Sequence, residues 1–480
     1  MKSIKKDIQY FVVLFICCVF VNYFLPSIIS MAFFSCILIL FFIAKNRNNY
    51  FWVMLVFLLL TAPGNLFHDM GVRPLPSISV PGFGRSISFG EVFTILALVK
   101  AYMSPIKQMV FYRNYLTILI IYSIFLLIWG MVLGFDLFKF LRSVRFIFPF
   151  FLLLLIPRLI PYRTVPKMVL LLFTSTSILL FCQIFDRLTG APVASFFGDF
   201  LRGEFVRFGD DEMIRSFYGP TIVLLSIVMS MAMLVENKKR NQNKYLYVIS
   251  LFAALGVFLS ATRGWILAVA ILFIGFAFFQ GRKIVKYAFY SIFLLGLLLS
   301  VPQINNQVFK SLDRFQTLGK LVQGDLTAGG TLGRITRRSP RVMNKFWEQP
   351  VFGFGFSEEY YMYSDGHVGN QTLLLNGGIV GYSIYLYFLL RIFKKYHEAY
   401  KKGNKPIFIF ILGLLGFVVI HSSSRMIFSY SLDTVTALSL GTFFFLSDYY
   451  LRFVISHDQK TFDEINKGID SACFSGGRNA

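Results

Sequence analysis

The feature that most constrains this chain is a succession of long apolar segments that continues almost from one end to the other. Hydrophobic residues make up 56% of the 480 residues and charged residues only 15%, well below the roughly 25% of charged residues typical of soluble domains. Segments of about 18 or more apolar residues recur, and each can cross about 30 Å of hydrocarbon as a helix. The sequence therefore predicts an all-α polytopic membrane protein.

The apolar segments predict about 12–14 transmembrane helices. They lie near residues 8–25, 27–44, 51–62, 87–104, 115–134, 140–156, 166–186, 216–235, 245–261, 264–280, 284–301, 370–391, 406–424 and 433–453. The long polar interruption between the last three and the rest, residues 302–369, predicts one large loop. The Pro/Gly-rich stretch 63–86 and the mixed-charge stretch 187–215 predict two smaller loops on the same side.

The net charge of +23 is carried by short basic clusters between the apolar segments. This is the pattern that the positive-inside rule leaves in membrane proteins, so we interpret the charge as an orientation signal and expect no nucleic acid as partner. If the lysine-rich N-terminus KSIKK lies in the cytoplasm, every strongly basic connection falls on that side. The loop 302–369 then faces outward.

Several arginines lie at the predicted outer ends of helices, where positive charge is disfavoured. Any one of them could be an interfacial side chain that extends its charge to water, but together they predict an outward-facing cationic pocket. Guanidinium holds phosphate oxygens in bidentate fashion, so the pocket suits a phosphate-bearing substrate. They are Arg142 and Arg145 in KFLRSVRFIF, Arg215 in IRSFYGP, Arg263 in FLSATRGW, and Arg425, beside His421, in HSSSRM.

The long loop adds a group that can transfer protons. His367 is its only histidine and titrates near neutral pH, while Arg334 lies in the glycine-rich, basic stretch GGTLGRITRRS. Asp365, Glu358 and Glu359 are acids that could orient the histidine. The alternative is that His367 only caps or begins the next helix.

Other classes of site have no support in the sequence. There are no carboxylates at glycosidase spacing, no Asp-x-Asp for a metal-bound sugar nucleotide, no phosphate-binding Gly-Lys-Ser/Thr loop and no cysteine or histidine pattern for zinc. We therefore expect neither metal nor cofactor. Glu91 and Lys100 fall within a predicted span; we favour pairing in the interior of the protein over the alternative, a proton path.

Four stretches, in this order, resemble the motifs of one family, the bacterial O-antigen ligase and O-antigen polymerase superfamily. They are IRSFYGP, LSATRGW, NKFWEQPVFGFGF and GHVGNQTLLLNGGIVGY, and the resemblance covers about residues 205–425. It implies a GT-C-like fold with an N-terminal transmembrane bundle (1–204), a ligase/polymerase-like core (205–425) that includes the loop 302–369, and a last helix with a cytoplasmic tail (426–480).

The resemblance also implies a chemistry. A glycan on undecaprenyl pyrophosphate would be transferred to an acceptor hydroxyl by a metal-independent, inverting glycosyltransferase in the bacterial cytoplasmic (inner) membrane, with the active site facing the periplasm or cell exterior. His367 would activate the acceptor as the catalytic residue, Arg263 and Arg334 would bind the pyrophosphate, and Arg215 would assist. We add Arg142 and Arg145 as further candidate ligands.

The acceptor separates two versions of this function. Val368 follows the histidine where the family usually has Asn, Ser or Gln, and Tyr382 stands where the ligase subgroup often has Thr. We therefore favour a repeat-unit polymerase in cell-surface polysaccharide assembly, with a chain-length regulator as a candidate partner. The alternatives are a ligase that transfers the glycan to lipid A-core and, from another class, a flippase or exporter of the same lipid-linked glycan.

Overall fold

The structure is a computed structural model of the chain. It describes residues 2–44, 50–61, 77–79, 86–104, 109–134, 137–189, 219–236, 243–260, 262–281, single positions between 289 and 305, 334–423 and 425–453. The predicted loop that contains Arg215 lies outside these ranges, and the predicted span 284–301 is described only at single positions.

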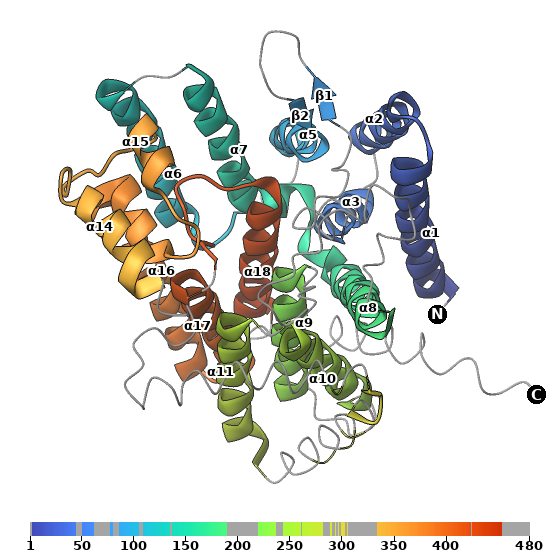
Figure 1. Ribbon diagram of the computed structural model, residues 1–480. Coiled ribbons are helices and arrows are strands. Elements are labelled where there is room, and N and C mark those ends of the chain that lie inside the picture. Colours follow the sequence, from blue (N-terminus) through green and yellow to red (C-terminus); the bar gives the residue numbers. More distant parts are fainter. Residues whose placement is uncertain are drawn as a thin grey trace, which may run out of the picture.

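Helices account for nearly all of the described chain (Figure 1). Their bounds are α1 Lys2–Phe24, α2 Ser27–Ile43, α3 Tyr50–Thr61, α5 Phe89–Met103, α6 Arg113–Leu133, α7 Leu137–Leu159, η2 Tyr162–Thr164, α8 Val165–Thr189, α9 Pro220–Glu236, α10 Asn243–Leu259, α11 Arg263–Gln280, η7 Arg334–Arg338, α14 Ser339–Phe346, α15 Glu358–Tyr363, α16 Gly369–Lys401, α17 Ile407–Ser423 and α18 Thr434–Phe453. Strands β1 (Ser77–Ser79) and β2 (Ser86–Ser88) pair in antiparallel fashion near the end of the predicted loop 63–86.

This architecture confirms the predicted all-α polytopic membrane fold. Every predicted span except 284–301 has a described helix at its position. Three described segments combine the length and hydropathy needed to cross a bilayer, namely Arg113–Leu133, Tyr162–Phe185 and Gly369–Lys401, and six shorter helices are similarly apolar. The number of crossings and the three domain boundaries stay predictions.

The helices differ in how much of their surface is covered. Residues 222–234 of α9 and 52–60 of α3 are buried on all sides, as expected for helices in the interior of a bundle. Helix α18 lies centrally in Figure 1 and packs against α7, α3, α5, α9 and α17. Helix α6 instead keeps an exposed apolar stripe. The fold therefore has an inner layer of enclosed helices and an outer layer with an open apolar face.

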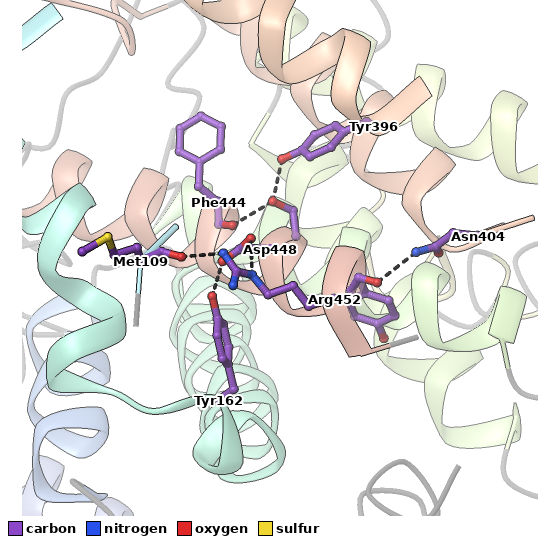
Figure 2. A network of polar contacts seen from close by, with 9 residues as sticks. Met109, Tyr162, Tyr396, Asn404, Phe444, Asp448 and Arg452 are labelled. Atoms are coloured by element: carbon purple, nitrogen blue, oxygen red, sulfur yellow. Dashed lines mark hydrogen bonds and ion pairs between the residues drawn. The ribbon is translucent and has the colours of Figure 1, made fainter. Parts of the chain in front are cut away.

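A polar network ties several helices together near the C-terminal end of α18 (Figure 2). Asp448 is fully buried, accepts a hydrogen bond from the Tyr162 hydroxyl, and forms an ion pair with Arg452 at 3.0 Å. At the preceding residue, the Tyr396 hydroxyl donates to Ser447 Oγ at 2.5 Å. Because a buried carboxylate is costly unless it is paired and hydrogen-bonded, this network allows α18 to carry an acid into the bundle. We call it the Asp448 network.

Candidate functional site

Helix α16 is broken at Gly378, and this break organises the surroundings of the candidate site. The residue has φ +64° and ψ −170°, so the helix stops there and resumes at the next residue. A positive φ of this kind is readily adopted only by glycine. The turn Pro350–Phe356 of the long loop lies against the break, and we call the pair of segments the glycine clasp.

Main-chain hydrogen bonds hold the glycine clasp together. Phe354 N donates to Leu375 O and Gly355 N donates to Asn376 O, both at 2.8 Å. In the opposite direction, Ile379 N donates to Pro350 O at 2.9 Å and Val380 N to Val351 O at 3.2 Å. The side-chain amide of Asn376 donates to Gly355 O at 2.6 Å. The main-chain N–H and C=O groups that lose their helical partners at the break are thus hydrogen-bonded to the turn, as buried main-chain groups must be.

The glycines of the clasp are required by close contact as well as by backbone conformation. A Cβ atom on Gly355 (φ +55°) would lie 2.4 Å from Leu126 O of α6, and one on Gly378 would lie 2.2 Å from Val351 O. On the same side of α16, the Tyr122 and Tyr430 hydroxyls donate to Gly377 O (2.7 Å) and Gly381 O (2.5 Å). The motif PVFGFGF and the later glycines are therefore explained by packing.

The glycine clasp reaches membrane depth. Phe356 N donates to Leu126 O at 3.2 Å, and Trp129 Nε1 donates to Gly353 O at 2.9 Å. Leu126 precedes the last residue of α6 by seven positions, which is about 10 Å along the helix axis. Since α6 is one of the candidate membrane spans, this part of the predicted outer loop folds back between helices as a re-entrant segment. Irregular backbone is tolerated there because the main-chain groups of the turn are hydrogen-bonded within the protein.

His367 lies in a tight turn just before α16. Its side chain is exposed, and its backbone N–H donates to Asp365 Oδ1 at 2.8 Å, which is the Asx-turn pattern. The Thr372 hydroxyl donates to Asp365 O at 2.7 Å, and Val368 N donates to the same oxygen at 3.2 Å. The helix N-cap residue is Val368. The turn is thus fixed by Asp365 and Thr372 while the imidazole is presented to the surroundings.

The end of α17 and the connection from α17 to α18, residues 425–433, pack against the His367 turn. Met426 N donates to Gly366 O at 2.7 Å, and the Asn370 amide donates to Ser422 Oγ at 2.9 Å. His421 is buried against Gly369, where an added Cβ would lie 2.3 Å from His421 O. The position of His367 therefore depends on a segment more than fifty residues further along the chain.

The buried imidazole of His421 holds that connection in place. Its Nδ1 accepts hydrogen bonds from Ile427 N (3.2 Å) and Phe428 N (3.3 Å). Because Nδ1 is the acceptor, the ring proton resides on Nε2. Nε2 is buried and has no hydrogen-bond partner among the described residues. Sequence reasoning noted His421 only as part of an outer turn; its burial could not be inferred from the motif.

Helix packing brings Arg263 to the same end of the bundle. Helices α11 and α17 are antiparallel neighbours, with Ala268 opposite Gly416 and Gly275 opposite Leu412. Arg263 begins α11, five residues before Ala268, and His421 follows Gly416 by five residues. At 1.5 Å per residue, both lie about 7–8 Å beyond the same contact. Arg263 is therefore level with the base of the His367 turn.

Arg145 on α7 borders the same connection from the other side. Leu432 N donates to Phe146 O at 2.9 Å, and Ser143 Oγ is 2.6 Å from the Tyr361 hydroxyl of α15. Arg145 itself forms a bidentate ion pair with Glu91 at the start of α5, with Nε 2.6 Å from Oε1. The expected interior pairing of Glu91 is thus confirmed. Lys100 donates instead to Phe42 O and Ala44 O at the end of α2.

A second charged cluster supports the loop beside His367. Lys345 of α14 lies between Glu348 (2.6 Å) and Glu359, and over the Phe354 ring at 4.9 Å. Partial burial acts to lower the pKa of Lys345, but hydrogen bonds and charge attraction from the two glutamates outweigh it, so the pKa is raised. Arg338 Nη1 lies 3.5 Å from Asp365 Oδ1. These contacts fasten α14 and α15 to the His367 turn.

Of the predicted site residues, the structure places His367, Arg263 and Arg145 around the connection 425–433. For Arg142 and Arg334 only the backbone positions, in α7 and at the start of η7, belong to the described part, and Arg215 lies outside it. No group of three or more His, Cys, Asp or Glu side chains able to hold a metal ion occurs within the described ranges. The His367 turn thus carries an exposed imidazole, and the guanidinium of Arg338 lies beside the same turn, 3.5 Å from Asp365 Oδ1.

Comparison with known proteins agrees with this arrangement. A search among curated proteins found no match. A family model described as O-antigen ligase matches residues 248–386, a segment that begins in α10, includes the start of α11 with Arg263, and ends in α16 beyond the glycine clasp. The match confirms the resemblance seen in the motifs: this segment of the chain is similar to the O-antigen ligase family.

Proposed function

We propose that this protein, a membrane glycosyltransferase of the O-antigen ligase/polymerase type, transfers a glycan from undecaprenyl pyrophosphate to another lipid-linked repeat and so acts as a polymerase. The observation that carries the proposal is the presentation of His367. The backbone turn that carries this exposed imidazole is held by Asp365, Thr372 and Met426, at the end of the bundle where α11 begins with Arg263. Such a group can accept a proton next to a bound anion.

The proposed reaction has one chemical step. The acceptor hydroxyl oxygen attacks the anomeric carbon of the donor glycan, a new carbon–oxygen bond forms, and the bond between that carbon and the pyrophosphate oxygen breaks. The pyrophosphate leaves with the bonding electron pair, and the hydroxyl proton passes to His367. A single displacement inverts the anomeric centre. No nucleotide or metal takes part, because the pyrophosphate is already a good leaving group.

The arginines have distinct proposed roles. Arg263 and Arg334 bind the pyrophosphate and stabilise the charge that develops as it departs, and Arg215 assists them. Glu91 holds two nitrogens of Arg145, so a phosphate at Arg145 would compete with a carboxylate. We therefore assign Arg145, with Arg142 one turn before it, to the rim of the pocket.

The second candidate function is a ligase whose acceptor is lipid A-core, and the description of the matching family model favours it. Both functions place the reaction on the outer face of the bacterial cytoplasmic membrane, and both use the same donor. A chain-length regulator is a partner only of the polymerase. The residues Val368 and Tyr382, which depart from the ligase pattern, are the reason for preferring the polymerase.

The test is a reconstituted assay with undecaprenyl-pyrophosphate repeat units and no other protein, with products separated by length. A ladder of lipid-linked oligomers is the expected result. Transfer only after lipid A-core is added would establish the ligase, and no transfer in either case by well-folded protein would contradict the enzyme and favour the flippase.

A matched pair of variants locates the chemistry. His367→Ala should lower transfer about 10²- to 10⁴-fold, the usual contribution of a positioned base. His397→Ala removes an exposed histidine from the far part of α16, where it stacks on Phe393, and should leave transfer unchanged. Equal activity of the two variants would refute the role of His367.

A further inference from the structure

The segment Phe346–Phe356, from the end of α14 through the turn of the glycine clasp, has some apolar side chains buried and others exposed. Phe346, Phe354 and Phe356 are buried, whereas Trp347 is 66% exposed and Val351 53% exposed. Phe352 is also exposed. Large apolar groups that lie together on an open surface commonly mark a site of contact with a partner or a membrane.

This exposed edge continues an apolar face that belongs to a membrane helix. The Phe352 ring lies 5.5 Å from Phe125 and 5.9 Å from Trp129 of α6. Exposed apolar residues recur along α6 at helical spacing, at Ile121, Ile124, Ile128 and Val132. Because α6 is long and apolar enough to cross a bilayer, its exposed stripe faces lipid. The surface of Phe352 and Val351 is thus an extension of a lipid-facing surface.

The exposed edge continues onto the helix after the break. Ile379, the first residue after Gly378, is exposed and donates its N–H to Pro350 O at 2.9 Å. The carbonyl of Val351 is paired with Val380 N. Main-chain polar groups in hydrocarbon must be hydrogen-bonded within the protein. At this edge the carbonyl groups of Pro350 and Val351 are hydrogen-bonded in this way, while the Val351 side chain stays exposed.

Polarity along the chain gives the direction of insertion. The preceding segment carries exposed Arg337, Arg338 and Arg341, which suit water and anionic headgroups. Trp347 follows, and tryptophan prefers the boundary between headgroups and hydrocarbon. Val351 and Phe352 come next, at the level of Phe125 and Trp129. The three arginines come first, Trp347 and the exposed Glu348 follow, and the apolar Val351 and Phe352 come last, an order that matches a passage from water through headgroups into a bilayer.

We propose that the segment Arg337–Phe352 is a membrane-contacting anchor of the long loop, in which Trp347 lies at headgroup level and Val351 and Phe352 contact acyl chains of the surrounding bilayer. The anchor holds α14, and with it the Arg338–Asp365 ion pair beside His367, at the membrane surface. This proposal concerns the lipid bilayer and holds whether or not the proposed function is correct.

The test uses tryptophan fluorescence of the full-length protein in vesicles of mixed phosphatidylcholine and phosphatidylglycerol. The chain has four tryptophans, so the signal of Trp347 is the difference between the wild type and Trp347→Phe. Bromine atoms near the headgroup end of the acyl chains should quench this signal more than bromine atoms near the chain ends. Acrylamide in the water should quench it weakly.

Two further variants calibrate depth in the Trp347→Phe background. The new tryptophan of Val351→Trp should be quenched most by bromine atoms deeper in the acyl chains. The new tryptophan of Glu358→Trp replaces an exposed acid at the start of α15 and should respond to acrylamide instead. Unchanged melting temperatures show that each variant keeps the fold.

Two results would overturn the proposal. Quenching of Trp347 by acrylamide, with no effect of either brominated lipid, would place the segment in water. Insensitivity to every quencher, together with disulfide formation between Val351→Cys chains, would show that a second copy of the protein covers this edge.

Discussion

The two ends of the helix bundle satisfy buried polar groups by different means. Around the glycine clasp, main-chain groups of a turn and of a broken helix pair with each other. In the Asp448 network, side chains from several helices pair across the bundle (Figure 2). Main-chain pairing needs close approach and therefore glycines, while side-chain pairing needs only a few matched polar residues. The first arrangement leaves ionisable side chains such as His367 exposed; the second encloses them.

This difference predicts that the clasp is the less tolerant of added volume. Gly355→Ala places a methyl group against Leu126 O in a backbone conformation that disfavours it, so we expect a loss of about 2–5 kcal/mol in the free energy of unfolding. Thermal unfolding in detergent would measure it. Gly134→Ala, where an added Cβ meets nothing within 4 Å, is the control, and equal melting of both variants would contradict the packing role of Gly355.

The Asp448 network should affect stability without affecting chemistry. Asp448→Leu leaves the Tyr162 hydroxyl buried without its acceptor, at a cost on the order of 1–3 kcal/mol; the ion pair adds little because Arg452 is partly exposed. Asp448→Asn retains an acceptor and should lose less. The transfer rate per folded molecule should stay at the wild-type value in both variants. A rate that falls in parallel with stability would show that the Asp448 network also affects the reaction.

His421 tests whether the connection 425–433 positions the His367 turn. His421→Leu removes the acceptor of two buried backbone amides, so we expect roughly 1–3 kcal/mol less stability and a lower turnover number with little change in the KM for donor. His421→Asn keeps an acceptor near the position of Nδ1 and should restore most of the turnover. If Asn and Leu behave alike, the hydrogen bonds of the imidazole do not position the turn.

The smallest expected effect concerns Lys345. Its pKa in the folded protein is raised, so its ion pairs stabilise the fold fully below the unfolded pKa, near 10.4, and this contribution is lost as pH rises through the folded value. The melting temperatures of wild type and Lys345→Met should therefore differ by a constant amount at neutral pH and converge at strongly alkaline pH. A difference that persists there would assign the effect to packing on Phe354.

Much of the fold could be predicted from the sequence because each span carries its own signal. The apolar segments placed the helices, and the basic connections predicted their orientation. The break at Gly378 could not be predicted this way, because the apolar pattern continues across it. The glycines of PVFGFGF were visible as a motif, but their reason, contact with Leu126 and the broken helix, depends on residues far apart in the chain.

The candidate site was predictable in part. His367 was singled out as the only histidine of the long loop and Arg263 as an arginine at a predicted outer helix end; packing places both at the same end of the bundle, and their roles stay predictions. The positions of Arg334 and Arg215 stay predictions. The roles of His421 and Asp448 were missed, since a buried polar residue within an apolar helix differs little in sequence from one that faces lipid. The acid Asp448 followed four residues later by Arg452 was the available signal.

The broken helix has a consequence for the order in which the protein is made. The turn 350–356 is synthesised before residues 375–380, so its amides have no partners when it first emerges. Each unpaired amide placed in hydrocarbon costs several kcal/mol, and the turn therefore stays in water until α16 has entered the bilayer. The glycine clasp can thus close once α16 has been made, whereas the Asp448 network must wait for α18, which is synthesised later.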